Sequence, residues 1–220
     1  MNSRKYNIVC FGDSNTHGYN ADTGGRFSYS ERWPGILSSL LGESYSIIEE
    51  GLNGRTTAFD EPGFQSRNGL RALTPILERV RPVDLLILML GTNDTQTWAA
   101  SSADEIVKGM DKLIITASCL PVVWRSMPQI LVIAPPAIDL THASFQYSSV
   151  NDASAAMSEE LAALYENLAQ KRHCHFFDAG SVPGMTMSSY DGIHLTKGSH
   201  ELLAHALEKE IRRISGESAS

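Results

Sequence analysis

The sequence is poor in cysteine and in long apolar runs, and each shortage excludes a class of protein. Its three cysteines, Cys10, Cys119 and Cys174, are odd in number and lack the spacing of metal or redox motifs. We therefore expect reduced thiols in a cytoplasmic protein. No stretch approaches the roughly 18 consecutive apolar residues that a membrane-spanning helix needs. With 42% hydrophobic and 20% charged residues, the composition is that of an ordinary soluble globular protein.

Positive charge is also scarce. The formal net charge is -7, and because binding to nucleic acid depends on clustered lysine and arginine, we expect no nucleic-acid partner. Ahead of Gly12 the sequence has an apolar run of only four residues, which is shorter than the roughly 7 to 15 apolar residues of an export signal. These features predict a cytoplasmic protein that has no membrane partner.

What the sequence does contain is an alternation of two periodicities. Short apolar runs typical of strands occupy 6–11, 45–48, 83–90, 130–134 and 175–177. Apolar residues recur on one helical face in 103–118, with Ser102 as the expected cap, in 152–172 and in 197–214. Weaker helical patterns cover 33–41 and 68–80, because Pro34 and Pro75 suit the first turn of a helix better than its interior.

Strands that alternate with helices predict right-handed crossovers and a parallel sheet with helices on both faces. The expected architecture is a three-layer α/β/α sandwich with a five-stranded parallel sheet, formed by residues 1–220 as a single domain. The segments 20–30, 57–67 and 139–150 lack a pattern. Long loops of this kind often line binding sites.

Polar loops follow the predicted strands, at the edge of the sheet where ligands of such folds bind. A serine hydroxyl needs an imidazole to take its proton and a third group to orient that imidazole. Ser14 follows the first strand, while Asp191 and His194 precede the last helix, three positions apart. The Asp191 carboxylate can reach Nδ1 of His194 and leave Nε2 facing Ser14. Donors for a developing oxyanion are the N–H groups of Ser14 and Gly54 and the side-chain amide of Asn93.

Taken in order, GDSN, NGRTT, GTND and DGIH resemble the four consensus blocks of the SGNH (GDSL-type) hydrolase family. The resemblance implies the flavodoxin-like SGNH hydrolase fold, Ser14 as nucleophile, and Asp191 and His194 as the other members of a triad. It also implies Ser14, Gly54 and Asn93 as the oxyanion hole. The strings EEGLNGRTT, MLGTNDT and FFDAGSV look like the arylesterase and acyltransferase subgroup, which implies short-chain ester substrates, transfer of acyl groups to alcohols and homo-oligomers.

Two residues depart from the pattern. Where many relatives read GDSLT followed by Trp, this chain has Asn15 and His17. We expect these residues to make a more polar rim beside the nucleophile, which puts the substrate range and transferase ability of the relatives in question.

The leading hypothesis is a serine esterase that hydrolyses small carboxylic esters through an acyl-enzyme and needs no cofactor and no metal. Alternatives in the same family are a carbohydrate acetylesterase and a lysophospholipase or thioesterase. From other classes, a flavodoxin-like phosphate- or nucleotide-binding module would use the GDSNTHG loop, although GxGxxG and GxxxxGK[ST] spacings are both missing. A metal-dependent phosphoesterase is the last alternative. The GxSxG elbow of α/β-hydrolases is not found around Ser14.

Structural roles compete with these assignments. Ser14 can simply cap a helix, and Asp13 and Asp94 are expected to brace their loops. Arg55 can bind a carboxylate at the site or hold Glu49 or Glu50 by paired hydrogen bonds, and we expect the structural role. The remaining interpretations are that His173, Cys174 and His175 bind no metal, that His200 and His205 lie at the surface or its boundary, and that His17, His142, Trp98, Phe145 and Tyr147 can border the cleft.

Overall fold

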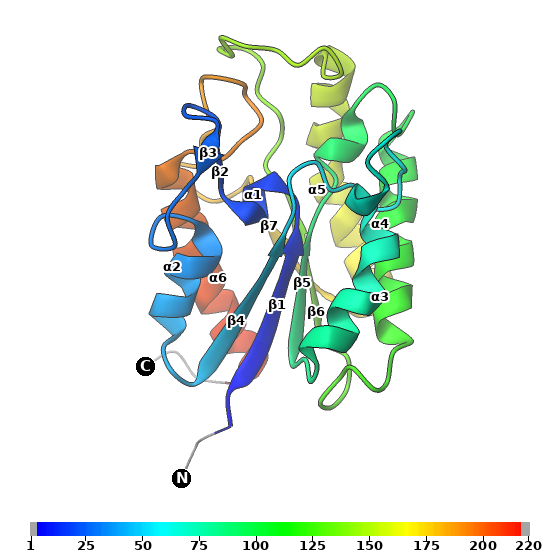
Figure 1. Cartoon of the computed structure of the whole chain (residues 1–220), viewed down its shortest axis with the longest axis vertical. Coiled ribbons are helices and arrows are strands. Elements are labelled where there is room, and N and C mark those ends of the chain that lie inside the picture. The colour runs from blue at the N-terminus through cyan, green and yellow to red at the C-terminus, as the bar shows by residue number, and fades with distance from the viewer. Residues whose placement is uncertain (1–3, 217–220) are drawn as a thin grey trace.

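A parallel sheet of five strands, covered by helices on both faces, forms the framework of the computed structural model (Figure 1). The model describes residues 4–216, so the ends of the predicted 1–220 domain lie outside the described residues. The strands are β1 (Tyr6–Gly12), β4 (Tyr45–Gly51), β5 (Leu85–Met89), β6 (Ile130–Ala134) and β7 (His175–Asp178). Their order β4-β1-β5-β6-β7 is that of flavodoxin-like sheets. The predicted three-layer architecture is confirmed.

The central strand β5 is buried along its whole length, as expected of a continuous apolar run that helices cover on both faces. It is shorter than the predicted strand 83–90. Val83 forms only an isolated bridge to Trp124. At the other end, the carbonyl of Leu90 accepts a hydrogen bond from the Tyr165 hydroxyl at 3.1 Å.

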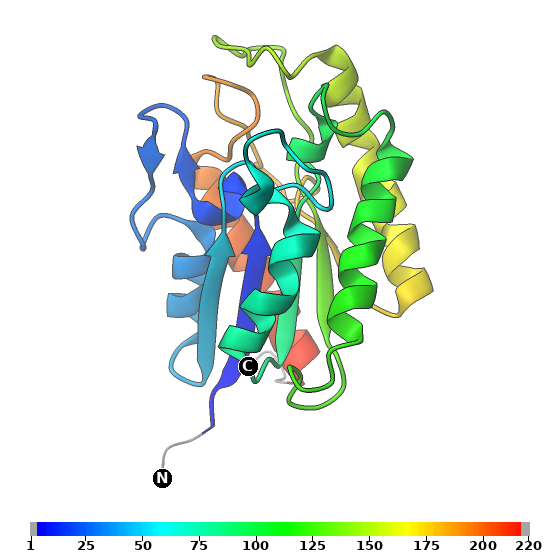
Figure 2. The same cartoon turned by 45° about the vertical axis from the view of Figure 1, so that its right-hand side comes forward.

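Helices of the two outer layers match the predicted bounds to within one residue. On one face α2 (Trp33–Leu41) packs against α6 (Lys197–Ser215). The other face carries α3 (Gly69–Val80), α4 (Ala103–Ser118) and α5 (Asp152–Arg172), which are seen side by side in Figure 2. No helix among residues 4–216 combines the length and the apolar character that crossing a bilayer requires.

Two details of the helices differ from expectation. Pro75 lies inside α3, where it cannot donate the hydrogen bond that the carbonyl of Arg71 would accept. The helix continues because Leu73 and Leu77 are fully buried in the core. Ser102 occupies the N-cap position of α4, but its side chain makes no capping hydrogen bond.

Short elements gather at the carboxyl end of the sheet, at the top of Figure 1. Helix α1 (Ser14–His17) follows β1 directly, and a small hairpin of β2 (Tyr19–Asn20) and β3 (Gly25–Arg26) comes next. The 3₁₀ helices η1 (Gln65–Arg67) and η2 (Asn93–Thr95) follow β4 and β5. The loops predicted to line a site therefore do lie at this end.

His200 was expected at the surface or its boundary, and that expectation is wrong. The side chain is fully buried, and its Nδ1 accepts a hydrogen bond from the backbone N–H of Trp33 at 3.3 Å. Trp33 is the first residue of α2, so this N–H has no partner within its own helix. His200 thereby joins α6 to the start of α2. His205, five positions further along α6, is exposed as predicted.

The burial of His200 predicts a loss of stability in acid. Burial, with the charges of His194 and Arg32, lowers the pKa of His200 from 6.5 to about 3. Below pH 6.5 the unfolded chain binds a proton that the folded protein does not, so the free energy of unfolding falls by about 1.4 kcal/mol per pH unit in this window. Urea denaturation of His200→Asn should show a flatter pH dependence than the parent protein. The exposed control His205→Asn should keep the parent slope, and equal slopes for all three proteins would contradict the prediction.

Candidate active site

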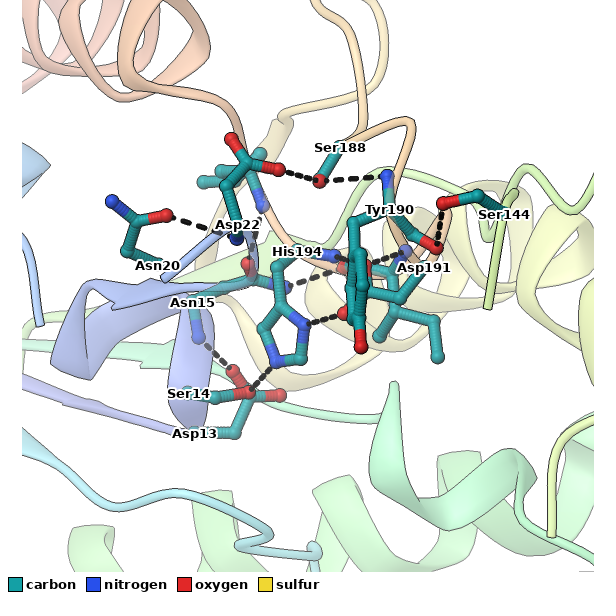
Figure 3. A network of polar contacts seen from close by, with 12 residues as sticks. Asp13, Ser14, Asn15, Asn20, Asp22, Ser144, Ser188, Tyr190, Asp191 and His194 are labelled. Atoms are coloured by element: carbon teal, nitrogen blue, oxygen red, sulfur yellow. Dashed lines mark hydrogen bonds and ion pairs between the residues drawn. The ribbon is translucent and has the colours of Figure 1, made fainter. Parts of the chain in front are cut away.

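Two segments bring Ser14, His194 and Asp191 together at the carboxyl end of the sheet: the turn after β1 carries Ser14, and the loop before α6 carries both Asp191 and His194 (Figure 3). The Ser14 Oγ lies 2.9 Å from Nε2 of His194, and Nδ1 of His194 lies 2.6 Å from Oδ2 of Asp191. All three residues are buried, with Ser14 and His194 6% and 7% exposed. Ser14 and His194 nevertheless both line an adjoining cavity.

Asp191 fixes the tautomer of His194. Burial acts to raise the pKa of Asp191, but hydrogen bonds from the His194 ring and from the backbone N–H groups of Ile193 and His194 hold it below its usual value. The carboxylate is therefore ionised at neutral pH and can only accept hydrogen bonds. Nδ1 must carry the ring proton, which leaves the lone pair of Nε2 directed at the Ser14 hydroxyl.

Ser14 is held by the turn that it begins. Asp13, rather than Ser14, is the N-cap of α1, and its carboxylate accepts a hydrogen bond from the backbone N–H of Asn15 at 2.9 Å. The alternative in which Ser14 serves only as a cap therefore does not describe this structure. Asp13 braces the turn, as predicted.

A cavity of about 320 Å³ opens over these residues. Ser14, Gly54, Asn93 and His194 all line it, so the three predicted oxyanion donors border one space. Asn93 Nδ2 donates to the carbonyl of Arg55 at 3.1 Å. Its Oδ1 accepts from the Gln96 side chain at 3.1 Å, which fixes the orientation of the amide.

Two carboxylates lie buried beneath the cavity. Burial raises the pKa of Asp13 to about 6, against the lowering effect of the Asn15 N–H and the nearby positive groups. Burial also raises the pKa of Asp94 to about 7, with the charge of Asp13 adding to the effect. Asp94 accepts hydrogen bonds from both the N–H and the hydroxyl of Thr57. It ties the loop after β4 to η2, as predicted.

Arg55 has the expected structural role, and Glu50 is one of its partners, but through the backbone carbonyl and not the carboxylate. Arg55 is 4% exposed, and its guanidinium donates to the backbone carbonyls of Gly12 and Glu50. It also lies over the ring of Phe11 at 4.2 Å. Burial lowers the pKa of Arg55 to about 10. The carboxylate of Glu49 is held instead by Arg26 and Arg32.

Nothing in the sequence indicated that several other residues belong to the site. The ring of Tyr19 packs against His194 with centroids 4.6 Å apart. Glu61 and Arg67, both in the predicted loop 57–67, line the cavity and form an ion pair at 2.6 Å. Asn15 was expected on a polar rim. It is instead 2% exposed and bonded to the loop that carries His194.

The other residues that were expected to border the cleft do not all lie at the same cavity. Tyr147 lines the cavity. His142 lines a separate cavity of about 600 Å³ beyond β6 and β7, and Trp98 donates to the Gln96 side chain, which itself borders the site. Within residues 4–216, no group of three or more His, Cys, Asp or Glu side chains is placed to hold a metal ion.

Comparison with known proteins identifies the family. Residues 10–202 match the model of the GDSL-like lipase/acylhydrolase family. No curated protein sequence matches the chain.

Two solved structures are similar over nearly their whole length. A carbohydrate acetylesterase family member from Sinorhizobium meliloti shares 36% identity, with a TM-score of 0.88 over 96% of this chain and 99% of that one. The native aryl esterase of M. smegmatis shares 35% identity, with a TM-score of 0.85 over 94% and 99% of the two chains. The protein belongs to the GDSL-like lipase/acylhydrolase family, and it is a carboxylic ester hydrolase of the SGNH type.

The backbone at Gly54 makes this position sensitive to a side chain. Its φ of +78° strains any other residue by roughly 1 kcal/mol, and a Cβ there would lie 2.8 Å from Nε of Arg67. We expect Gly54→Ala to lower kcat/KM for ester hydrolysis about tenfold, because both the turn and the Arg67–Glu61 pair must shift.

The matched control is Gly63→Ala. Gly63 also has a positive φ, of +82°, but an added Cβ would meet nothing within 4 Å. It should lose stability in thermal denaturation while keeping the parent kcat/KM. Equal kcat/KM values for the two variants would contradict the prediction.

Proposed function

We propose that the protein hydrolyses small carboxylic esters through an acyl-enzyme on Ser14. The observation that carries this proposal is the hydrogen-bonded series Ser14–His194–Asp191. The hydroxyl proton of Ser14 passes to Nε2 of His194 as Oγ bonds to the carbonyl carbon. The bond to the leaving alcohol then breaks, and His194 returns the proton to that alcohol. Water repeats the sequence and releases the acid.

Stabilisation of the oxyanion is the second part of the proposal. Ser14, Gly54 and Asn93, the residues that carry the three proposed donors, line the same cavity. Donors held in place before the reaction stabilise developing charge without reorganisation. Asn93 is oriented by Gln96 and by the carbonyl of Arg55. We assign these three donors to the oxyanion hole.

Cavity size and chemistry support short acyl groups. A volume of about 320 Å³ lies near the lower end of ligand-binding pockets, which run from roughly 300 to 1,000 Å³. Tyr19 and Tyr147 offer aromatic surface, while Glu61, Arg67 and Gln96 offer charge and hydrogen bonds. Aromatic surface suits an aryl ester. The polar wall favours a second candidate, an acetylated carbohydrate, since hydroxyl groups can bond to both members of the Glu61–Arg67 pair.

The alternatives from other classes have less support. Asp13 already occupies the backbone N–H of Asn15 at the start of α1, and α1 has only four residues. A phosphate would therefore meet a carboxylate at that helix terminus. The described residues also offer no ligand set for a metal-dependent phosphoesterase. Acyl transfer to alcohols, a homo-oligomeric state, a cytoplasmic location and a single domain over residues 1–220 stay predictions.

The assignment of Ser14 is tested by substitution and labelling. Ser14→Ala and His194→Ala should each lower kcat for p-nitrophenyl acetate by about 10³-fold or more, because the hydroxyl or its proton acceptor is removed. A fluorophosphonate should label the parent protein at Ser14, as peptide mass spectrometry can show. The control Ser39→Ala, an exposed position on α2, should behave as the parent. A Ser14→Ala protein that retains most of the parent rate would refute the mechanism.

The substrate class is tested by a panel of acetyl, butyryl and octanoyl p-nitrophenyl esters together with an acetylated monosaccharide. We expect kcat/KM to fall from acetyl to octanoyl, because the cavity is small. Arg67→Ala should lower kcat/KM for the acetylated sugar about tenfold more than for p-nitrophenyl acetate, the loss of one hydrogen bond to a charged group. Arg71→Ala, which removes an exposed pair with Asp60, is the matched control. Equal losses for both substrates would favour the aryl ester.

A further inference from the structure

The residue after Ser14 reaches across the site to the backbone on both sides of His194. Asn15 Nδ2 donates to the carbonyl of Ile193 at 3.2 Å, and Asn15 Oδ1 accepts from the N–H of Leu195 at 2.9 Å. These contacts join positions 178 and 180 residues apart. We call this pair of hydrogen bonds the Asn15 clamp.

One planar amide can satisfy both groups because, in an extended chain, the carbonyl of one residue and the N–H of the residue two further along point the same way. The polar groups of His194 itself bond elsewhere. Its N–H donates to Asp191 Oδ1 at 3.1 Å, and its carbonyl accepts from the N–H of Ser188 at 2.7 Å. The segment that carries the imidazole is thus bonded to its own loop on one side and to Asn15 on the other.

Asn15 is itself held rigidly. Its N–H donates to Asp13, and its carbonyl accepts from Nε1 of Trp33 at 3.1 Å. The whole residue is 2% exposed, so each of its polar groups exchanges water for a protein partner. Asn15 is therefore held at its backbone and at its side-chain amide, so the position of α1 determines the position of the backbone beside His194.

We propose that Asn15 is a positioning residue, whose clamp sets the distance and direction from Ser14 Oγ to Nε2 of His194. The inference rests on the proposed function of these two residues. Proton transfer needs the oxygen and the nitrogen at hydrogen-bond distance, and an error of about 1 Å in such a geometry costs about 10²-fold in rate. Asn15 is not among the residues that line the cavity over Ser14, and its side chain bonds to the backbone beside His194, so we expect it to affect kcat and not substrate binding.

The central experiment is Asn15→Leu, which keeps the approximate volume of the side chain and removes both bonds. With p-nitrophenyl acetate we expect kcat to fall about 10- to 100-fold and KM to change less than about twofold. Asn15→Asp keeps an acceptor for Leu195 but sets a buried carboxylate oxygen against the carbonyl of Ile193 in place of the donor, so kcat should fall in this variant as well. Circular dichroism and thermal denaturation establish that each variant is folded at the assay temperature.

A double-mutant cycle separates positioning from general damage. If Asn15 acts through His194, adding Asn15→Leu to His194→Ala should change the rate of Ser14 labelling by a concentrated fluorophosphonate less than about twofold. A merely structural role would lower the rate by the same factor in both backgrounds. The matched control is Asn7→Leu, at the far end of β1, where the side chain donates to the carbonyl of Pro82. It should keep the parent kcat.

The outcomes separate the two proposals. A parent-like kcat in folded Asn15→Leu overturns the clamp, and so does an equal fractional loss of labelling rate with and without the His194 side chain. If Ser14→Ala is inactive at the same time, the proposed function still stands. If Asn15→Leu does not fold, parent-like kcat in folded Asn15→Asp overturns it equally. An active Ser14→Ala protein refutes the proposed function itself.

Discussion

The contact between the Ser14 hydroxyl and the His194 imidazole joins the first strand of the sheet to the loop before the last helix, 180 residues away. It depends on the parallel sheet, whose strands all present their carboxyl ends at one edge. The sheet in turn is held by the burial of β1, β5 and β6 between two helical layers. The apolar core thus determines where the polar chemistry takes place.

Beneath the site, the protein tolerates charges that a core normally excludes. Asp13 and Asp94 have raised pKa values, and Arg55 has a lowered one, because each has left water. Each is compensated by bonds that hold a loop: Asp13 to α1, Asp94 to Thr57, and Arg55 to two backbone carbonyls. A site made of loops gains rigidity in this way, since loosening any one of them would leave a buried charge unpaired.

Periodicity was sufficient to predict the strands and helices to within a few residues, because burial on one or both faces imposes it on the sequence. Ser14, Asp191 and His194 could be proposed because their residue types and order match a recognisable pattern. The contacts of Asn15 and the burial of His200 could not be predicted, since their partners lie more than 160 positions away. The same limit applies to Arg55. It bonds to backbone carbonyls, and because every residue has a carbonyl, the sequence does not indicate which one an arginine will contact.

The distance along the chain between Ser14 and His194, the two side chains proposed to react, has a consequence for synthesis. His194 comes after β7 in the chain, so it is synthesised after all five strands of the sheet, whereas Ser14 directly follows the first of them. A nascent chain with β1 to β6 in place would carry the serine without its proton acceptor. The proposed proton acceptor of Ser14 is therefore in place only after the non-local contacts of the sheet and of the loop before α6 have formed, the class of contact that forms slowly in folding.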